Sequence, residues 1–278
     1  MNSSRLTHLL LASTLSTAAA PIASTQPAQQ HPTVVLASTT SVENSGLLAY
    51  ILPIFTRDTG IEVHVVAQGT GQALATAAKG NADLVLVHDP DAEDRFMAEH
   101  HGMSRREIAW NDFILVGPAI DPAHIAGGQD AGAALRAIAQ AQAPFVSRGD
   151  KSGTNAKEKR LWQSAGITPG GTWYRDIGGG MGAALNTAAA MDAYTLSDRG
   201  TWLNFGNKRD LRIVVEGGRD LLNRYDVITL NPDEHAPEGR QPAQQFADWL
   251  ASPAGQTAIA SYQVGGQKLF HPERDPKP

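Results

Sequence analysis

The sequence of 278 residues contains no cysteine, and this absence removes several kinds of chemistry at once. Disulfide bonds, thiolate metal sites and cysteine nucleophiles are excluded, and so is a lipid anchor on an N-terminal cysteine. The chain also lacks a strong charge of either sign, because 23 basic residues face 28 acidic ones and the formal net charge is −5. Without a basic surface, we expect no binding to nucleic acid.

Long hydrophobic runs are missing as well. The apolar stretch Leu9–Ala20 follows a single positive charge at Arg5 and ends in small residues, a pattern typical of a secretory signal peptide. It is too short to serve as a membrane anchor in the mature protein. We predict a signal peptide over residues 1–23, a flexible lead-in over 24–32, and export to a periplasm without a lipid anchor.

Familiar catalytic motifs are absent too. The chain has no Gly-x-Ser-x-Gly elbow, no His-Glu-x-x-His and no Walker loop. His88 and the pair His100-His101 lack the spacing of zinc ligands, so we interpret them as surface or turn histidines. The glycines at Gly178–Gly182 do not form a dinucleotide fingerprint, and we attribute them to helix packing. We predict no enzyme activity, no cofactor and no direct site for a metal cation.

Strand-like and helix-like segments alternate along most of the chain. Buried-strand patterns at Thr33–Ala37, Glu62–Val66, Asp83–Val87 and Asp112–Val116 are separated by segments with helical periodicity. Alternation of this kind predicts an α/β fold with mostly parallel sheets.

The same segments suggest two lobes. We predict that residues 33–116 and 212–278 form the first lobe and that 117–211 form the second. The chain would then return to the first lobe through Arg212–Val215. Two crossings between lobes make a hinge, and a ligand cleft is expected between them.

The segment Phe145–Lys159, with the sequence FVSRGDKSGTNAKEK, is the most informative part of the chain. A short apolar strand end runs into Ser147 and Arg148, a turn follows, and a helix begins near Thr154. The first turn of a helix has unpaired backbone N–H groups and partial positive charge, so it binds anions. Arg148 adds a permanent charge with fork-shaped donors. The alternative is an ordinary capped surface helix with a solvated arginine.

Two further loops have the same design. Ser38–Ser41 follows the strand pattern Thr33–Ala37 and precedes a helical segment, and Gln68–Gln72 does so after Glu62–Val66. Each loop alone is compatible with ordinary turn chemistry. In α/β sheets, however, ligands bind at the carboxyl ends of strands, where helix N-termini converge. Three such loops together predict a site for a tetrahedral oxyanion.

A family resemblance extends over essentially the whole chain after the predicted signal. Seven motifs carry it, in matching order and spacing: STTSVENSGLL at Ser38–Leu48, GTGQAL at Gly69–Leu74, ADLVLVHDP at Ala82–Pro90, NDFILVGP at Asn111–Pro118, SRGDKSGT at Ser147–Thr154, GMGAALN at Gly180–Asn186 and YTLSDRGTW at Tyr194–Trp202. The chain resembles the TupA-type tungstate-binding proteins of ABC importers, within the type II periplasmic binding proteins. One departure is Ser38, where the family usually has threonine.

The resemblance implies a two-lobed type II periplasmic binding protein. Such a protein captures tungstate, or molybdate, in the inter-lobe cleft and delivers it to an ABC permease. We expect a monomer that meets the membrane only through the permease. The ligand-binding residues carried over by motif are Thr39, Thr40, Ser41, Gly69, Thr70, Ser147, Arg148, Ser152, Gly153 and Thr154.

Other readings remain open beside this one: a receptor or sensor for phosphate or sulfate, or a phosphate-ester hydrolase. Phosphate keeps a proton at neutral pH and therefore benefits from a hydrogen-bond acceptor in its site. Asp89 and Asp150 could supply that acceptor, so phosphate stays a possible ligand. We interpret Asp89 as an Asx-turn residue before Pro90 and Asp150 as a local partner of Arg148. We assign Arg199 to an ion pair that fixes the second lobe.

Overall fold

The structure is a computed structural model that describes residues 32–150, 152–233 and 239–273. The predicted signal peptide, and the predicted lead-in as far as residue 31, lie outside these ranges. Within these ranges, no helix has the length and apolar character needed to cross a membrane.

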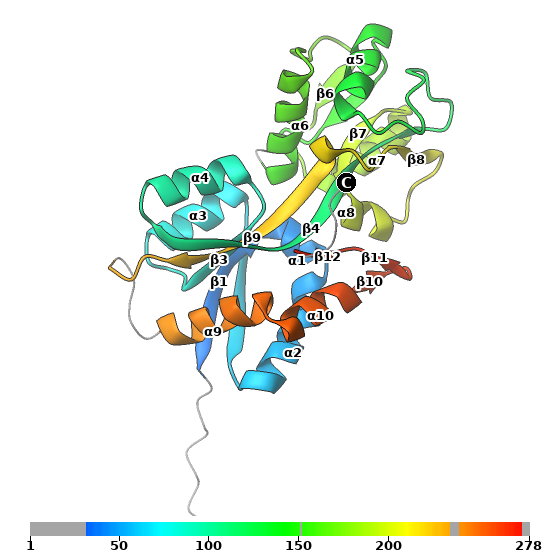
Figure 1. Cartoon of the computed structure of the whole chain (residues 1–278). Coiled ribbons are helices and arrows are strands. Elements are labelled where there is room, and N and C mark those ends of the chain that lie inside the picture. Colours follow the sequence, from blue (N-terminus) through cyan, green and yellow to red (C-terminus); the bar gives the residue numbers. More distant parts are fainter. Residues whose placement is uncertain (1–31, 151, 234–238, 274–278) are drawn as a thin grey trace, which may run out of the picture. The chain divides into compact units, whose positions relative to one another are not determined.

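The main sheet has the strand order β12-β4-β9-β3-β1-β2 (Figure 1). Its strands are β1 (Thr33–Thr39), β2 (Glu62–Gln68), β3 (Leu84–Val87), β4 (Gly102–Pro118), β9 (Leu222–Leu230) and β12 (His271–Pro272). β1 is parallel to β2 and β3, whereas β9 runs antiparallel to both β3 and β4. The carboxyl ends of β1, β2 and β3 therefore lie at one edge, as the alternating pattern predicts.

Helices cover both faces of this sheet. One face packs against α1 (Thr40–Asn44), α2 (Leu47–Thr59), α9 (Arg240–Ala251) and α10 (Pro253–Ser261). The other face packs against α3 (Thr70–Ala78) and α4 (Pro90–Ala98). Alternation along β3 explains the two cores, because Leu84 and Leu86 face the first set of helices while Val85 and Val87 face the second.

The long strand β4 connects two parts of the molecule. Its first part pairs with β9, and its last residues, from Phe113 to Pro118, pair antiparallel with β7 (Thr195–Asp198) and β8 (Leu211–Val215) (Figure 1). The sequence predicts only Asp112–Val116 as strand here. The reason is that the preceding run around Arg105 and Arg106 is charged and exposed, so it lacks the apolar signal of a buried strand.

Around the end of β4 lies a second pair of cores. Phe113 and Leu115 pack on one side, and Ile114 and Val116 on the other. The elements here are α5 (Ala131–Ala141), β5 (Phe145–Ser147), α6 (Gly153–Ser164), β6 (Tyr174–Asp176), α7 (Met181–Met191) and α8 (Arg199–Asn204). Short elements complete the fold: a 3-10 turn at Arg219–Leu221, β10 (Gln263–Val264) and β11 (Gln267–Lys268).

The α/β architecture is as expected, but the sheet is mixed. Parallel pairing of strands is found for β1 with its two neighbours and for β5 with β6, and the pairs made by β4 and β9 are antiparallel. Val214 and Val215 of β8 pack in the core around the end of β4. The strand that returns the chain to β3 of the main sheet is β9. The lobe boundaries 33–116 with 212–278, and 117–211, stay a prediction.

Candidate functional site

The loop between β5 and α6 has the geometry that its sequence predicts. Ser152 is the N-cap of α6, and its hydroxyl accepts a hydrogen bond from the backbone N–H of Asn155 at 3.3 Å. Gly153 and Thr154 form the first turn of the helix, and both are buried. Their position at the positive end of a helix of 12 residues makes this loop a competent anion site.

Arg148 lies beside this helix start and is 8% exposed. Its Nε and Nη2 donate to Oδ2 of Asp150 at 3.1 and 2.5 Å, and its Nη1 donates to Oγ1 of Thr154 at 3.4 Å. These contacts use three of the five N–H groups that a guanidinium carries. The other two have no partner among the described residues, so they can donate to a ligand at the start of α6.

Asp150 is the local partner of Arg148, as expected from the sequence. Its second oxygen accepts from the backbone N–H of Ser152 at 3.1 Å. Burial acts to raise the pKa of Asp150, but the hydrogen bonds from Ser152 and Arg148 outweigh burial and hold that pKa below its usual value. Asp150 is therefore ionised at neutral pH, and its oxygens are used by protein donors.

In the first loop, the hydroxyls of Thr39 and Ser41 lie 3.0 Å apart. Thr39 caps α1 by accepting from the backbone N–H of Val42 at 3.1 Å. Thr40 is exposed at the start of the same short helix. Ser38, the departure from the family pattern, donates to the carbonyl of Leu86 at 2.8 Å. Its hydroxyl thus stabilises the sheet, and serine at this position leaves the neighbouring hydroxyls in place.

The second loop contributes a buried hydroxyl. Thr70 is the first residue of α3, preceded by Gly69 at the N-cap. Thr70 is 4% exposed, and its Oγ1 has no hydrogen-bond partner among the described residues. An unpaired buried hydroxyl costs about 1–3 kcal/mol, so a bound acceptor would relieve that cost.

The second and third loops meet at Gly153, and His88 connects the first loop to them. A Cβ atom placed on this glycine would lie 3.1 Å from Cε1 of His88 and 3.4 Å from Oγ1 of Thr70. His88 in turn contacts Ser41, with 2.9 Å between Nε2 and Oγ. The start of α6, the start of α3 and the end of β1 are therefore neighbours in space, which is the arrangement that the three loop motifs predict.

His88 lies against the predicted ligand residues Ser41 and Gly153, although its sequence context predicted no role there. It is 4% exposed, its Nδ1 lies 3.0 Å from Oδ1 of Asn223, and its ring stacks on Tyr225 with 5.0 Å between centroids. Burial is the main cause that lowers the pKa of His88. The interpretation as a surface or turn histidine is wrong for His88, although His100 is exposed in a turn. Its place directly after β3, at the edge where the loops gather, was the available signal.

Asp89 does not form the expected Asx-turn. It is the N-cap residue of α4, but its side chain makes no capping hydrogen bond. Its Oδ1 instead accepts from Nη1 of Arg160 in α6 at 3.0 Å, and the same nitrogen lies 3.1 Å from Oδ2 of Asp91. The expectation is wrong because a cation from another helix lies within reach of the carboxylate. The ion pair ties α6 to the start of α4.

Two more expectations concern the surroundings of the loops. Arg199 pairs with both oxygens of Asp112 and with Glu216, each at 2.6 Å, so the expected ion pair is present. Both partners lie outside residues 117–211, so the pair is not internal to the predicted second lobe but joins it to the predicted first lobe. The helix-packing explanation is wrong for Gly182, where a Cβ would meet nothing within 4 Å. The glycine run instead approaches the site, since the N–H of Gly179 donates to the carbonyl of Arg148 at 2.9 Å.

Ser147 has a different environment from the other predicted ligands. Its hydroxyl donates to Oε2 of Glu158 at 2.7 Å and accepts from Nδ2 of Asn155 at 3.1 Å. Ser147 is fully buried, and its hydroxyl hydrogen is used on a carboxylate beneath the loop. A direct contact between Ser147 and an anion stays a prediction.

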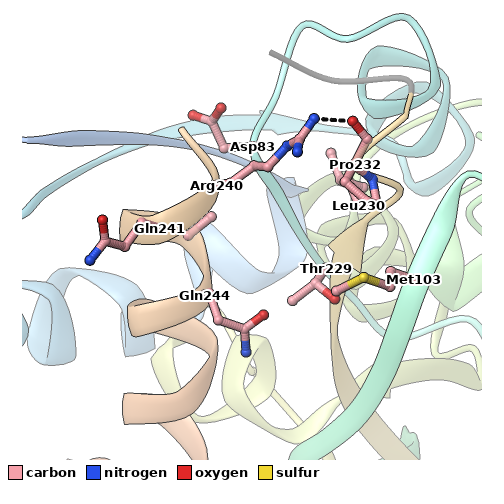
Figure 2. Close-up of a pocket in the computed structure, with 9 residues that line it drawn as sticks. Asp83, Met103, Thr229, Leu230, Pro232, Arg240, Gln241 and Gln244 are labelled. Atoms are coloured by element: carbon pink, nitrogen blue, oxygen red, sulfur yellow. Dashed lines mark hydrogen bonds between the residues drawn. The ribbon is translucent and has the colours of Figure 1, made fainter. Parts of the chain in front are cut away.

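A separate cavity of about 330 Å³ lies elsewhere, beside α9 (Figure 2). Asp83, Thr229, Arg240 and Gln244 are among its lining residues, and it contains none of the predicted ligand residues. The side chains of Arg240 and Gln244 project from α9 toward β9, and Arg240 donates to the carbonyl of Pro232. Although Arg240 and Gln241 begin α9, the carboxylate of Asp83 and the apolar side chains of Met103 and Leu230 also line this cavity, and this lining disfavours an oxyanion.

Comparison with known proteins gives this geometry a context. The model of the PBP superfamily domain matches residues 25–254. The tungstate-binding protein TupA of Peptoclostridium acidaminophilum is 44% identical over 256 residues, 91% of this chain and 90% of that protein. TupA of Campylobacter jejuni is 35% identical, over 83% of this chain and 87% of that protein. The chain belongs to the TupA family. Its PBP-type α/β fold is thereby confirmed.

A solved TupA structure agrees with this assignment. The tungstate-binding protein TupA from Desulfovibrio alaskensis G20 superposes with a TM-score of 0.80 at 40% identity. The match covers 88% of this chain and all of that one. The resemblance seen in the sequence motifs therefore extends to the three-dimensional fold of TupA proteins.

A buried carboxylate in α4, that of Glu93, predicts how the stability of the fold depends on pH. Burial raises the pKa of Glu93 from 4.5 to about 9, and neighbouring Asp226 adds to the shift. The folded protein therefore holds a proton that the unfolded chain releases above its own pKa. Stability from this group is complete below about pH 4.5 and is lost progressively as pH rises toward 9.

Glu93→Gln, which imitates the protonated carboxyl, should flatten this dependence. Urea unfolding at mildly acidic and alkaline pH measures it, with exposed Glu62→Gln as the control. The variant is expected to lose less stability than the wild type on going to alkaline pH. Equal losses in wild type and Glu93→Gln would contradict the prediction.

Proposed function

We propose that this protein captures tungstate, or molybdate, between its three hydroxyl-bearing loops and delivers the anion to an ABC permease. The convergence of the loops at Gly153, beside the unpaired hydroxyl of Thr70, is the observation that supports this most. The names of the TupA relatives support the choice of tungstate.

The donors at the site suit a dianion that can only accept hydrogen bonds. Tungstate carries no proton at neutral pH, so every one of its oxygens needs a donor. Arg148, Thr70 and the first turn of α6 supply N–H and O–H groups, and Asp150 is occupied by Arg148 and Ser152. Charge-assisted hydrogen bonds contribute about 1.5–3 kcal/mol each, so several of them support tight binding.

The predicted ligand set is Thr39, Thr40, Ser41, Gly69, Thr70, Ser147, Arg148, Ser152, Gly153 and Thr154. His88 lies behind this set, in contact with Ser41. In this proposal the protein is a monomer that captures the anion in a periplasm and then docks on the permease. The ion pair of Arg160 with Asp89 and Asp91 supports a role for α6 in holding the anion-bound form together.

Calorimetric titration of the purified protein with tungstate, molybdate, sulfate and phosphate tests the proposal. Tungstate and molybdate are expected to bind tightly, with one anion per chain, and sulfate and phosphate much more weakly. A phosphate response equal to that of tungstate would favour a general oxyanion receptor. No heat with any of the four anions would refute the proposal.

A substitution at Gly153 probes the meeting point of the loops. Gly153→Val is expected to weaken tungstate binding by at least about tenfold, because its side chain would press on His88 and Thr70 and occupy space beside the helix start. Gly182→Ala in the first turn of α7 is the matched control, since a Cβ there meets nothing within 4 Å. Equal affinities in the two variants would contradict this placement of the site.

A further inference from the structure

A continuous chain of hydrogen bonds leads from the first loop into the protein interior. Oγ1 of Thr39 lies 3.0 Å from Oγ of Ser41, which lies 2.9 Å from Nε2 of His88. Nδ1 of His88 lies 3.0 Å from Oδ1 of Asn223. The directions of these hydrogen bonds decide whether the hydroxyls of Thr39 and Ser41 can donate a hydrogen bond to an anion.

Asn223 fixes the direction at its end of the chain. Its amide nitrogen donates to Oδ1 of Asn111 and to the hydroxyl of Tyr225, both at 2.8 Å. Its carbonyl oxygen therefore faces the ring of His88, and Nδ1 must carry the hydrogen. In a neutral imidazole, Nε2 then holds only a lone pair, so the hydroxyl of Ser41 must donate to it.

The same direction continues to Thr39. Its oxygen accepts from the backbone N–H of Val42, and its own hydrogen is the one that can bridge to Ser41. As long as His88 is neutral, the hydrogen of Ser41 is thus committed to its Nε2. An oxyanion that only accepts hydrogen bonds gains nothing from the oxygen of Ser41 until that hydrogen is released.

We propose that His88 takes up one proton from solvent when the oxyanion binds, which reverses the bond between His88 and Ser41. Nε2–H then donates to Oγ of Ser41, and the Ser41 hydroxyl donates to an oxygen of the anion. This inference rests on the proposed function and adds His88 to it as a positioning residue. The only covalent bond formed in the protein is N–H at Nε2, and its proton comes from solvent.

Charged groups of both signs lie around His88, and burial of the ring holds its pKa below the usual value. Burial and Arg148 disfavour the imidazolium, whereas Asp198 and Asp89 favour it, and the ring of Tyr225 covers one face. Asp198 is the N-cap of α8, and Asp89 is paired with Arg160. A dianion arriving beside Ser41 and Gly153 adds negative charge next to the ring, which favours protonation.

Calorimetric titration with tungstate in two buffers of equal pH and different ionisation enthalpy measures the proton directly. Tungstate carries no proton at about pH 7–8, so any proton taken up goes to the protein. The wild type is expected to take up close to one proton per anion. Its affinity should rise by up to about tenfold for each unit that the pH falls in this range.

Two variants and a control connect the proton to His88. His88→Gln has no titrating ring, so it should bind about tenfold more weakly and show no proton uptake. Asn223→Asp places a carboxylate on Nδ1 and keeps His88 charged beforehand, so its proton uptake should also vanish. His64→Gln, an exposed histidine on β2, should match the wild type in both measurements.

Each outcome separates this inference from the proposed function. If the wild type binds tungstate with equal heats in the two buffers, no proton is taken up, and the role of His88 is overturned. In that case Nε2 already carries a hydrogen, and the hydroxyl of Ser41 can donate to the anion without proton exchange. Proton uptake that persists in His88→Gln would overturn it as well. A wild type that binds no tungstate would refute the proposed function itself.

Discussion

Arg148→Ala is expected to weaken tungstate binding by about 10²–10⁴-fold. The two N–H groups of Arg148 that its protein partners leave available would each make a charge-assisted hydrogen bond, worth about 1.5–3 kcal/mol. At 1.4 kcal/mol per factor of ten, their loss gives this range. Calorimetric titration measures the change in Kd.

The control for this substitution is Arg175→Ala, which removes an exposed arginine from the neighbouring strand β6. Its Kd should stay within about twofold of the wild type, because exposed charges at a distance are screened by salt. Thermal unfolding of both variants checks that Asp150, left without its partner in Arg148→Ala, does not unfold the loop. Arg148→Ala that is folded and binds tungstate as tightly as the wild type would remove Arg148 from the site.

The second large effect concerns stability and lies beneath the same loop. Glu158 is 2% exposed, and its carboxylate accepts from Ser147 at 2.7 Å, from Tyr174 at 2.8 Å and from Nε1 of Trp162 at 3.1 Å. Glu158→Ala leaves these buried donors unpaired and opens a void. We expect it to lower the free energy of unfolding by about 3–5 kcal/mol.

Urea unfolding at constant pH measures this loss. Glu158→Gln keeps the shape and one acceptor oxygen, so it should lose clearly less than Glu158→Ala. Lys159→Ala, at the exposed next position of α6, should change stability by no more than about 0.5 kcal/mol. A loss below about 1 kcal/mol in Glu158→Ala would show that this network does not hold β5, β6 and α6 together.

Much of the fold follows from local pattern. The strand–loop–helix units at β1, β2 and β5 were readable because short apolar runs ended in hydroxyl and glycine residues before helical periodicity began. The antiparallel role of β4 and β9 was not readable, since pairing between residues more than a hundred positions apart leaves no local signal. Charged residues on the exposed half of β4 concealed that strand further.

For the site, the sequence indicated which loops gather but not how their hydrogen bonds run. Arg148, Thr70 and Gly153 were recognisable from their motifs, and the structure places them close together. His88 was missed because its importance depends on Asn223, a residue 135 positions away with no motif of its own. Asp89 was misread for the same reason, because its partner Arg160 comes from a distant helix.

A crystal structure with tungstate, in which anomalous scattering at the tungsten edge locates the anion, tests the proposed site most directly. We predict one tungsten position, with its oxygens within hydrogen-bond distance of Arg148, Thr70 and the backbone N–H groups at the start of α6. Ser41 should donate to the anion, with His88 behind it. An anomalous peak away from these three loops, such as in the cavity beside α9, would contradict the placement of the anion at the start of α6.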